Sequence, residues 1–340
     1  TTLQASKLLA TQASGLTTQQ IAAMETEDLV KLSNSVIAGL STDQVAALTA
    51  DQAASLTSTQ IGAMSTAQLA KLGGGNLQSL TTSQIQSLTS TQLAGLTTTQ
   101  IASLETTDLA QISTSAIPGL TTAQMAALTG DQVAALTTSQ LAKLSSTQIG
   151  AIATGSIPSL TTVQAAALTA AQAAGLTTSQ IANLEVADAA SLTTTVVAAL
   201  TTTQVGGLTA EIVAGLTTSQ TAAMTSSQIG KLGTAQIEAL TTAQAAGLTA
   251  AQAAGLTTTQ IAKLEAVDVA KLSTSVIAGL SAAQVGAIGS SQIEALTTTQ
   301  VAVLTSAQVA GLSTSQIAAI ETVDLAKFST SAVTGFTTAH

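Results

Sequence analysis

The chain has 340 residues, a formal net charge of −9, and 8 Lys and Arg residues against 17 Asp and Glu residues. So few basic residues argue against a nucleic-acid surface or binding to anionic lipid, because both need clustered Lys or Arg. No apolar run approaches the ~20 residues that span a bilayer, so we expect no membrane span. The chain has no Cys, and disulfides therefore play no part in its fold.

A strict period of eight residues runs through the sequence. Every residue whose number is a multiple of eight, from Leu8 to Phe336, is Leu, Ile, Met or Phe. With that residue as position 0, the typical octad reads Leu-Thr-Thr-x-Gln-Ile-Ala-x, as in residues 96–103. One small unit stacked many times is the structure that such a period predicts. We therefore expect residues 1–340 to form a single continuous solenoid, as a piece of a longer array.

Each octad carries two devices that start a helix. Thr at position 1 and Gln at position 4 have the spacing of a capping box, in which each side chain bonds the other residue's backbone amide. Positions 0 and 5, such as Leu96 and Ile101, have the spacing of a hydrophobic staple. All Lys residues fall at position 7, and most acidic residues fall at positions 1, 3 and 4, which suits the helix dipole. The pattern predicts one short helix in each octad, for example over residues 97–103.

Two other arrangements of the octads are one long fused helix and a series of β-strands. One fused helix would rotate by about 80° per octad and smear the apolar residues around its surface. A strand would put Ile101 and Leu104 on opposite faces. The expected fold is therefore an all-α solenoid of short capped helices. A β-solenoid stays open as the alternative, because corners between strands could reset the alternation.

Stacking must stabilise these helices, since a helix of about seven residues is unstable alone in water. We expect the residues at positions 0 and 5 to form an apolar column, represented by Leu96, Ile101, Leu104, Leu128, Leu136, Leu176 and Leu256. Small residues at positions 6 and 7 would let neighbouring helices approach closely. Phe328 and Phe336 occupy the last two column positions and are candidates for a contact between chain ends.

A longer period interrupts the octads at intervals of 40 residues, where the cap or the Gln is often missing. These irregular octads begin at Leu32, Leu72, Ile112, Ile152, Leu192, Leu232 and Leu272, then at Ile288 and Phe328. Pro118 and Pro158 lie at position 6 of two of them, where a helix would lose an internal hydrogen bond. We expect the irregular octads to be kinked or less helical.

Acidic octads precede every second irregular one. They contain the pairs Glu25 and Asp28, Glu105 and Asp108, Glu185 and Asp188, Glu265 and Asp268, and Glu321 and Asp324. The last interval is three octads shorter than the others. This spacing predicts slightly more than three octads per solenoid turn, with the acidic octads aligned on one side.

The acidic pairs are the best candidates for a binding site. Calcium prefers about six to eight oxygen ligands, but each pair supplies only two carboxylates. The alternative is a variant helix cap, loosely paired with Lys31, Lys271 or Lys327. His340, the only His, occupies a Gln position and is interpreted as a chain end or tag remnant. No nucleophile lies beside a base, so we expect neither an enzyme nor a required cofactor.

Octads such as Leu128-Thr129-Gly130-Asp131-Gln132-Val133 resemble the Leu-Thr-x-x-Gln-Ile/Val arrays of large secreted bacterial surface and adhesin-type proteins. The resemblance spans the chain and implies an extracellular or cell-surface location with an adhesive or fibre-forming role. We expect a structural protein that associates with itself, head to tail and laterally, in a filament, sheath, biofilm matrix or adhesin stalk. The alternatives are a module that binds a protein, glycan or cell surface, and an ice-binding protein that uses rows of Thr.

Overall fold

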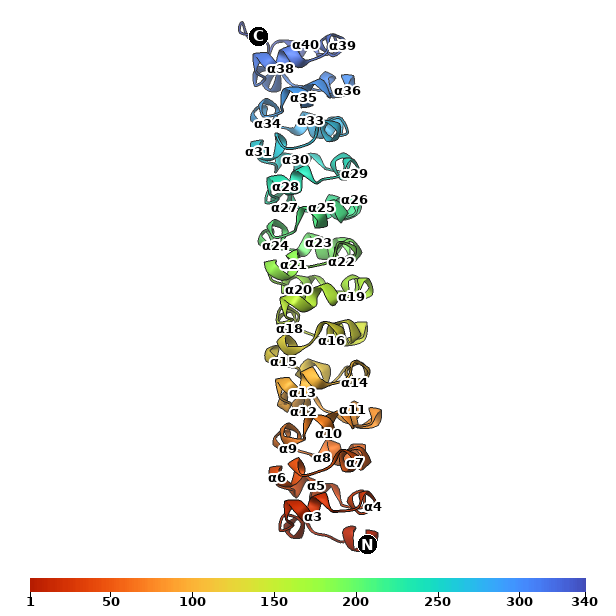
Figure 1. The fold of residues 1–340 in the computed structure, drawn as a ribbon. Coiled ribbons are helices and arrows are strands. Elements are labelled where there is room, and N and C mark those ends of the chain that lie inside the picture. The colour runs from red at the N-terminus through yellow and green to blue at the C-terminus, as the bar shows by residue number, and fades with distance from the viewer. The chain divides into compact units, whose positions relative to one another are not determined.

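The computed structural model describes all residues from Thr1 to His340 and contains helices but no strands. The chain divides into two compact units, unit 1 at Thr1–Gly175 and unit 2 at Leu176–His340. Each unit is a stack of short helices joined by tight turns (Figure 1). The all-α solenoid is confirmed and the β-solenoid is wrong, while the continuity of one solenoid through both units stays a prediction. None of the helices is long and apolar enough to cross a lipid bilayer.

Almost every octad of unit 1 contains one α-helix, and the two octads with proline contain the 3-10 helices η1 and η2. The elements of unit 1 are α1 (Thr2–Ala5), α2 (Ala10–Ala13), α3 (Thr18–Ala22), α4 (Thr26–Leu29), α5 (Asn34–Gly39), α6 (Thr42–Ala46), α7 (Ala50–Ser55), α8 (Ser58–Ala63), α9 (Thr66–Lys71), α10 (Gly74–Gln78), α11 (Thr82–Ser87), α12 (Ser90–Gly95), α13 (Thr98–Ser103), α14 (Thr106–Gln111), η1 (Ile117–Gly119), α15 (Thr122–Ala127), α16 (Gly130–Ala135), α17 (Thr138–Leu141), α18 (Ser146–Gly150), η2 (Thr154–Ser159), α19 (Thr162–Ala167) and α20 (Ala170–Ala174).

Unit 2 repeats this order without a 3-10 helix. Its elements are α21 (Thr178–Ala182), α22 (Val186–Ser191), α23 (Thr194–Ala199), α24 (Thr202–Gly206), α25 (Ala210–Gly215), α26 (Thr218–Ala223), α27 (Ser226–Ile229), α28 (Thr234–Glu238), α29 (Thr242–Ala246), α30 (Ala250–Ala254), α31 (Thr258–Ile261), α32 (Ala266–Val269), α33 (Thr274–Gly279), α34 (Ala282–Gly286), α35 (Ser290–Glu294), α36 (Thr298–Ala302), α37 (Ser306–Ala310), α38 (Thr314–Ala319), α39 (Thr322–Leu325) and α40 (Thr330–Val333).

The predicted capping box starts most of these helices. In α13 the Thr97 hydroxyl accepts from the Gln100 amide at 3.1 Å, and the Thr97 amide donates to Gln100 Oε1 at 2.8 Å. The helix ends at Leu104, whose extended backbone has φ −61° and ψ 136°. No residue of the chain has a positive φ, so the turns between helices need no glycine. Each octad is thus a capped helix followed by an extended Leu.

The core of each unit consists of the side chains at positions 0 and 5. Ile101 is 0% exposed and Leu96 is 4% exposed. The remaining residues expected in the column, Leu104, Leu128, Leu136, Leu176 and Leu256, are also buried. Burying one such side chain contributes roughly 1.5–3 kcal/mol. Packing therefore supplies the stability that four- to six-residue helices lack by themselves.

Helices pack on partners three octads away. In unit 1, α8 packs on α11 and α11 packs on α14, and in unit 2, α27 packs on α30 and α30 packs on α33. Side-chain hydrogen bonds between turns join residues 25 to 31 positions apart, so one turn holds more than three and fewer than four octads. Figure 1 draws α4 and α14 on the same side of unit 1, and α22 and α39 on the same side of unit 2. This placement agrees with the expected alignment of acidic octads within each unit.

Small residues at position 7 allow the turns to approach closely. A Cβ added at Gly119 would overlap the backbone carbonyl oxygen of Ser90, 29 residues earlier, whereas a Cβ at Gly62 would meet nothing. The expectation of less helical irregular octads holds only for the proline octads. The others keep a short α-helix. A Ser or Thr cap starts several of them, as in α5, where the Val36 amide donates to Ser33 Oγ at 3.4 Å, whereas α10, α28 and α35 begin at a glycine N-cap.

Candidate functional site

The glutamine at position 4 does more than cap its own helix. In α16 the Thr129 amide donates to Gln132 Oε1 at 3.0 Å, which completes the capping box. The other end of the same side chain, Nε2, donates to the carbonyl oxygens of Ile101 at 2.8 Å and Leu104 at 2.8 Å. Gln132 is 2% exposed, so these bonds lie inside unit 1. We call this arrangement the glutamine clamp, because one side chain joins two consecutive turns.

The glutamine clamp recurs along both units. Its members are buried and donate to carbonyls 28 and 31 residues earlier, as Gln52, Gln68, Gln84, Gln100, Gln140, Gln164, Gln220, Gln244, Gln260, Gln284 and Gln308 show. The carbonyl at position 0 lies outside the helix and would otherwise be buried without a donor, at a cost of about 1–3 kcal/mol. Each clamp glutamine satisfies one such carbonyl.

The sequence pattern predicted the capping box of each Gln but not the hydrogen bonds that its Nε2 donates to the preceding turn. One feature of the sequence does indicate these bonds. A capping box accepts Glu as readily as Gln, yet no octad of this chain has Glu at position 4. Glutamate could accept from the cap amide but could not donate to the preceding turn. The exclusive use of Gln over Glu therefore marks a required donor.

Other donors replace glutamine at three positions. Asn76 Nδ2 donates to the Leu48 carbonyl at 2.6 Å, and Ser156 Oγ donates to the Leu128 carbonyl at 3.1 Å. His340, interpreted above as a chain end or tag remnant, has the contacts of a clamp residue. Its Nδ1 lies 3.2 Å from the Thr337 amide and its Nε2 lies 2.8 Å from the Leu312 carbonyl oxygen. The tautomer with a proton on Nε2 satisfies both contacts.

The acidic octads lack both the Thr or Ser at the N-cap and the glutamine at position 4. Glu25, Glu105, Glu185, Glu265 and Glu321 stand at the N-caps of α4, α14, α22, α32 and α39, and none makes a side-chain cap hydrogen bond. Each Glu therefore occupies the position of the expected variant cap, with its charge beside the first turn, but adds no cap hydrogen bond. These Glu side chains point into solvent and are exposed. The paired aspartates take the clamp position.

The aspartates at the clamp position are mostly buried and lack partners. Asp188 is 2% exposed, Asp268 is 1% exposed and Asp324 is 4% exposed. Both carboxyl oxygens of Asp268 and one of each of the other two are buried without a hydrogen bond. Asp28 and Asp108 are partly exposed. A carboxylate only accepts hydrogen bonds, so these residues cannot replace the glutamine donor while ionised.

Burial changes the acidity of these carboxyl groups. It raises the pKa of Asp188 to about 6, and the nearby charge of Glu185 adds to the increase. Burial also raises the pKa of Asp268. The nearby Thr242 hydroxyl lowers this pKa in part, although the two side chains form no hydrogen bond, and the negative charge of Glu265 raises the pKa further. The pKa of Asp108 is raised by burial and by Glu105. Ionisation of Asp108, Asp188 and Asp268 is therefore disfavoured at the clamp position.

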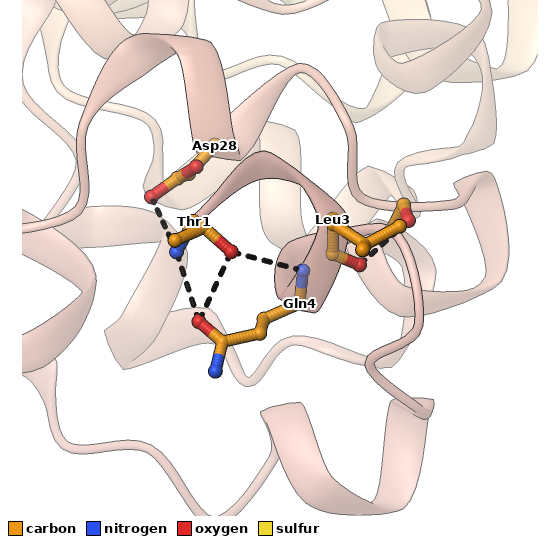
Figure 2. A network of polar contacts seen from close by, with 5 residues as sticks. Thr1, Leu3, Gln4 and Asp28 are labelled. Carbon is orange, nitrogen blue, oxygen red and sulfur yellow. Dashed lines mark hydrogen bonds and ion pairs between the residues drawn. The ribbon is translucent and has the colours of Figure 1, made fainter.

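Asp28 is the one clamp-position aspartate that lies beside a positive charge. The Thr1 amino group is 3.8 Å from Asp28 Oδ2 and also donates to Gln4 Oε1 at 3.1 Å (Figure 2). The other ion pair of the chain joins Lys263 Nζ and Glu238 Oε1 at 2.8 Å. Neither pair contains the lysines expected to partner the acidic octads, Lys31, Lys271 and Lys327.

The remaining candidates are a metal site at the acidic octads and the two Phe residues near the end of the sequence. No group of three or more His, Cys, Asp or Glu side chains gathers where it could hold a metal ion. Calcium binding by these octads stays a prediction. The rings of Phe328 and Phe336 pack edge to face with centroids 5.4 Å apart, and Phe336 contacts His340 in the same way at 6.0 Å. Their role in a contact between chain ends also stays a prediction.

Comparison with known proteins identifies the repeat. The ALTTAQ repeat family matches six segments, which together cover more than half of the chain: residues 21–58, 69–106, 101–138, 181–218, 229–266 and 261–298. No match was found among curated proteins. The matches support the predicted repeat array, and the secreted bacterial surface context stays a prediction.

Proposed function

The chain belongs to the ALTTAQ repeat family, and we propose that its role rests on the repeat array and that it associates with itself into an extracellular filament, sheath or stalk. It is a repeat-based structural protein. The observation that carries the proposal is the glutamine clamp. Buried amides such as Gln132 and Gln244 join each turn to the preceding one in both units.

A chain of clamps suits a protein that carries load along the axis of its stack. Separating two turns would expose the Leu and Ile column and would break several buried hydrogen bonds at once. Both losses are unfavourable, and the hydrogen bonds are strengthened by the low dielectric of the interior. Each turn contacts only its neighbours, so load passes from one turn to the next.

The outer surface suits close packing between copies of the chain. In α13 the residues Thr97, Thr98 and Thr99 are all exposed, uncharged and short. At position 3 some octads carry an exposed apolar side chain instead: Val163 in unit 1 is 67% exposed, and Val267 and Val323 in unit 2 are 58% and 61% exposed. Low charge and apolar spots on an exposed face favour lateral association.

Electron cryomicroscopy of the purified chain, together with sedimentation over a range of concentrations, tests this proposal. We expect ordered filaments in which the helices stack along the filament axis. We also expect the Val267→Thr and Val323→Thr variants to reduce lateral bundling with an unchanged circular dichroism spectrum. The matched control Thr99→Ser, at the same octad position, should bundle like the parent chain. Monomers at every concentration would overturn the proposal of self-association.

The proposed location outside the cell has a separate test. In cells that make the protein, an antibody against the array should bind without permeabilisation, and external protease should remove the signal. A signal that appears only after permeabilisation would place the array inside the cell and contradict this part of the proposal.

A further inference from the structure

We propose that Asp268 is a proton-sensitive connection between two turns of unit 2: protonated, it donates a hydrogen bond to the preceding turn, and ionised, it repels that turn. The octad of Asp268 would then be a point at which acidification tightens unit 2. This inference rests on the clamp geometry and does not depend on filament formation.

The register of neighbouring clamps defines what Asp268 faces. Gln260 Nε2 donates to the carbonyls of Ile229 at 3.1 Å and Leu232 at 2.7 Å, which are 31 and 28 residues earlier. Gln284 and Gln300 make bonds with the same spacing. Helix α32, which carries Asp268, packs on α29 as this register requires. The same spacing places the carbonyls of Ile237 and Leu240 opposite the Asp268 carboxyl group.

Only the protonated carboxyl group can replace part of the glutamine clamp. An ionised Asp268 presents acceptors to carbonyl oxygens, which are also acceptors, so the two turns repel each other. A neutral carboxylic acid has one O–H donor. Asp268 is 1% exposed and both of its oxygens lack a partner, so water does not relieve the repulsion. A proton also needs no extra space, whereas a metal ion would need room and further ligands that the site does not supply.

The charges around Asp268 do not cancel this effect. Within its own octad, Glu265 adds negative charge, and Lys271 at the far end makes no ion pair with the aspartate. Helix α29 has no titratable residue but places the Thr242 hydroxyl near the carboxyl group. Helix α35, which packs on the other side, carries Glu294 as its single titratable residue. Of these groups only Glu265 acts on the Asp268 carboxyl group through its charge, and no cation pairs with that group.

The direction of the effect on stability follows from proton linkage. A carboxyl group whose pKa is higher in the folded chain binds more protons when folded than when unfolded, so folding stability falls as pH rises. For Asp268 the loss begins near the ordinary aspartate pKa and is complete above its raised pKa. For Asp188, in an octad of the same type, the pH range over which stability falls ends above its pKa of about 6. Unit 2 should therefore be more stable at mildly acidic pH than at neutral pH.

Carbon-13 NMR of the full chain, labelled at the carboxyl carbon of Asp, tests the proposal directly. The chain contains only eight Asp residues, so the spectrum is simple. We expect the Asp268 signal, assigned with Asp268→Asn, to titrate at clearly higher pH than an ordinary aspartate. Titration of Asp268 in the ordinary aspartate range would overturn the proposal. A shift of the Asp268 signal on adding calcium at neutral pH would also overturn it, in favour of a metal ion.

Thermal unfolding gives an independent readout. The midpoint of the parent chain should be higher at about pH 4.5 than at about pH 7.5. Asp268→Gln restores a clamp, so its midpoint at the higher pH should exceed that of the parent, and the difference between the two pH values should shrink. Asp131→Asn, the matched control, should leave that difference unchanged. The proposal fails if Asp268→Gln also leaves it unchanged.

Discussion

Gln132 Nε2 lies 2.8 Å from the carbonyl oxygen of Leu104, a residue 28 positions earlier and one turn away. Without this donor the Leu104 carbonyl, which stands between two helices, would be buried without a partner. One side chain thus begins its own helix and completes the end of another. The clamp explains how helices of four to six residues persist: their ends are tied to the preceding turn as well as to their own caps.

Replacing a clamp glutamine by glutamate should separate its two roles. In Gln132→Glu the carboxylate can still accept from the Thr129 amide but faces the Ile101 and Leu104 carbonyls without a donor. We expect a loss of about 3–5 kcal/mol at neutral pH, because a buried charge is left without a partner. Urea unfolding measures the change.

Gln20→Glu is the matched control for this variant. Gln20 caps α3 in the same way, with its Oε1 at 2.8 Å from the Thr17 amide, but it is exposed. The control should change stability by less than about 1 kcal/mol, as is typical of surface substitutions. Equal losses in the two variants would show that capping alone explains the role of glutamine.

A methyl group at Gly119 should push two turns of unit 1 apart. The added Cβ in Gly119→Ala would overlap the backbone carbonyl of Ser90, which cannot rotate away. We expect a loss of about 1–3 kcal/mol, as for overpacking in a core. The same change at Gly62, where the Cβ would meet nothing, should be neutral or stabilising by up to about 1 kcal/mol. Thermal unfolding of the two variants compares them, and a similar loss in both would contradict the close packing at Gly119.

Removal of a single cap hydroxyl should weaken one octad only. Thr97→Ala removes the acceptor for the Gln100 amide and should cost about 1 kcal/mol. Thr98→Ala, one residue later and also exposed, removes no such bond and should be neutral or slightly stabilising, since Ala favours helix. Hydrogen exchange of the α13 amides would locate the effect, and faster exchange in the Thr98 variant than in the Thr97 variant would contradict it.

The buried aspartate of α22 should make part of the stability depend on pH. Burial and Glu185 raise the pKa of Asp188 to about 6, so its ionised form opposes folding at neutral pH. Asp188→Asn should therefore be more stable than the parent chain above about pH 6 and should lose this advantage near the ordinary aspartate pKa. Urea unfolding at several pH values measures the crossover. An advantage that does not vary with pH would mean that the carboxyl group does not titrate on folding.

The sequence predicts the fold well because each octad carries its own local signals. Thr97, Gln100, Leu96 and Ile101 lie within six residues, so capping and staple rules alone give the helix, its start and its buried face. The short helices of octads such as that of Val36 were expected to be less regular, but the Ser33 cap is sufficient to start the helix there. Local rules thus decide the elements and most of the core.

Contacts between turns were harder to predict because they depend on register. The partners of Gln132 lie 28 and 31 residues away, and no local rule connects them. The burial of Asp268 follows from the same register, since a charged residue alone would be expected in solvent. The absence of a side-chain cap hydrogen bond at Glu265 likewise could be recognised only from the side-chain positions in the structure. The absence of Glu from position 4 was the one signal in the sequence that pointed to the clamp.

Hydrogen exchange of the glutamine side-chain amides tests the clamp most directly. Nuclear magnetic resonance of chain labelled with nitrogen-15 at the Gln side chain reports on each Nε2 group, and Gln→Glu variants assign the signals. We expect strong protection of Gln132, whose Nε2 donates to the Ile101 and Leu104 carbonyls, and rapid exchange of the exposed Gln20. Exchange of Gln132 as fast as that of Gln20 would show that glutamine does not join the turns.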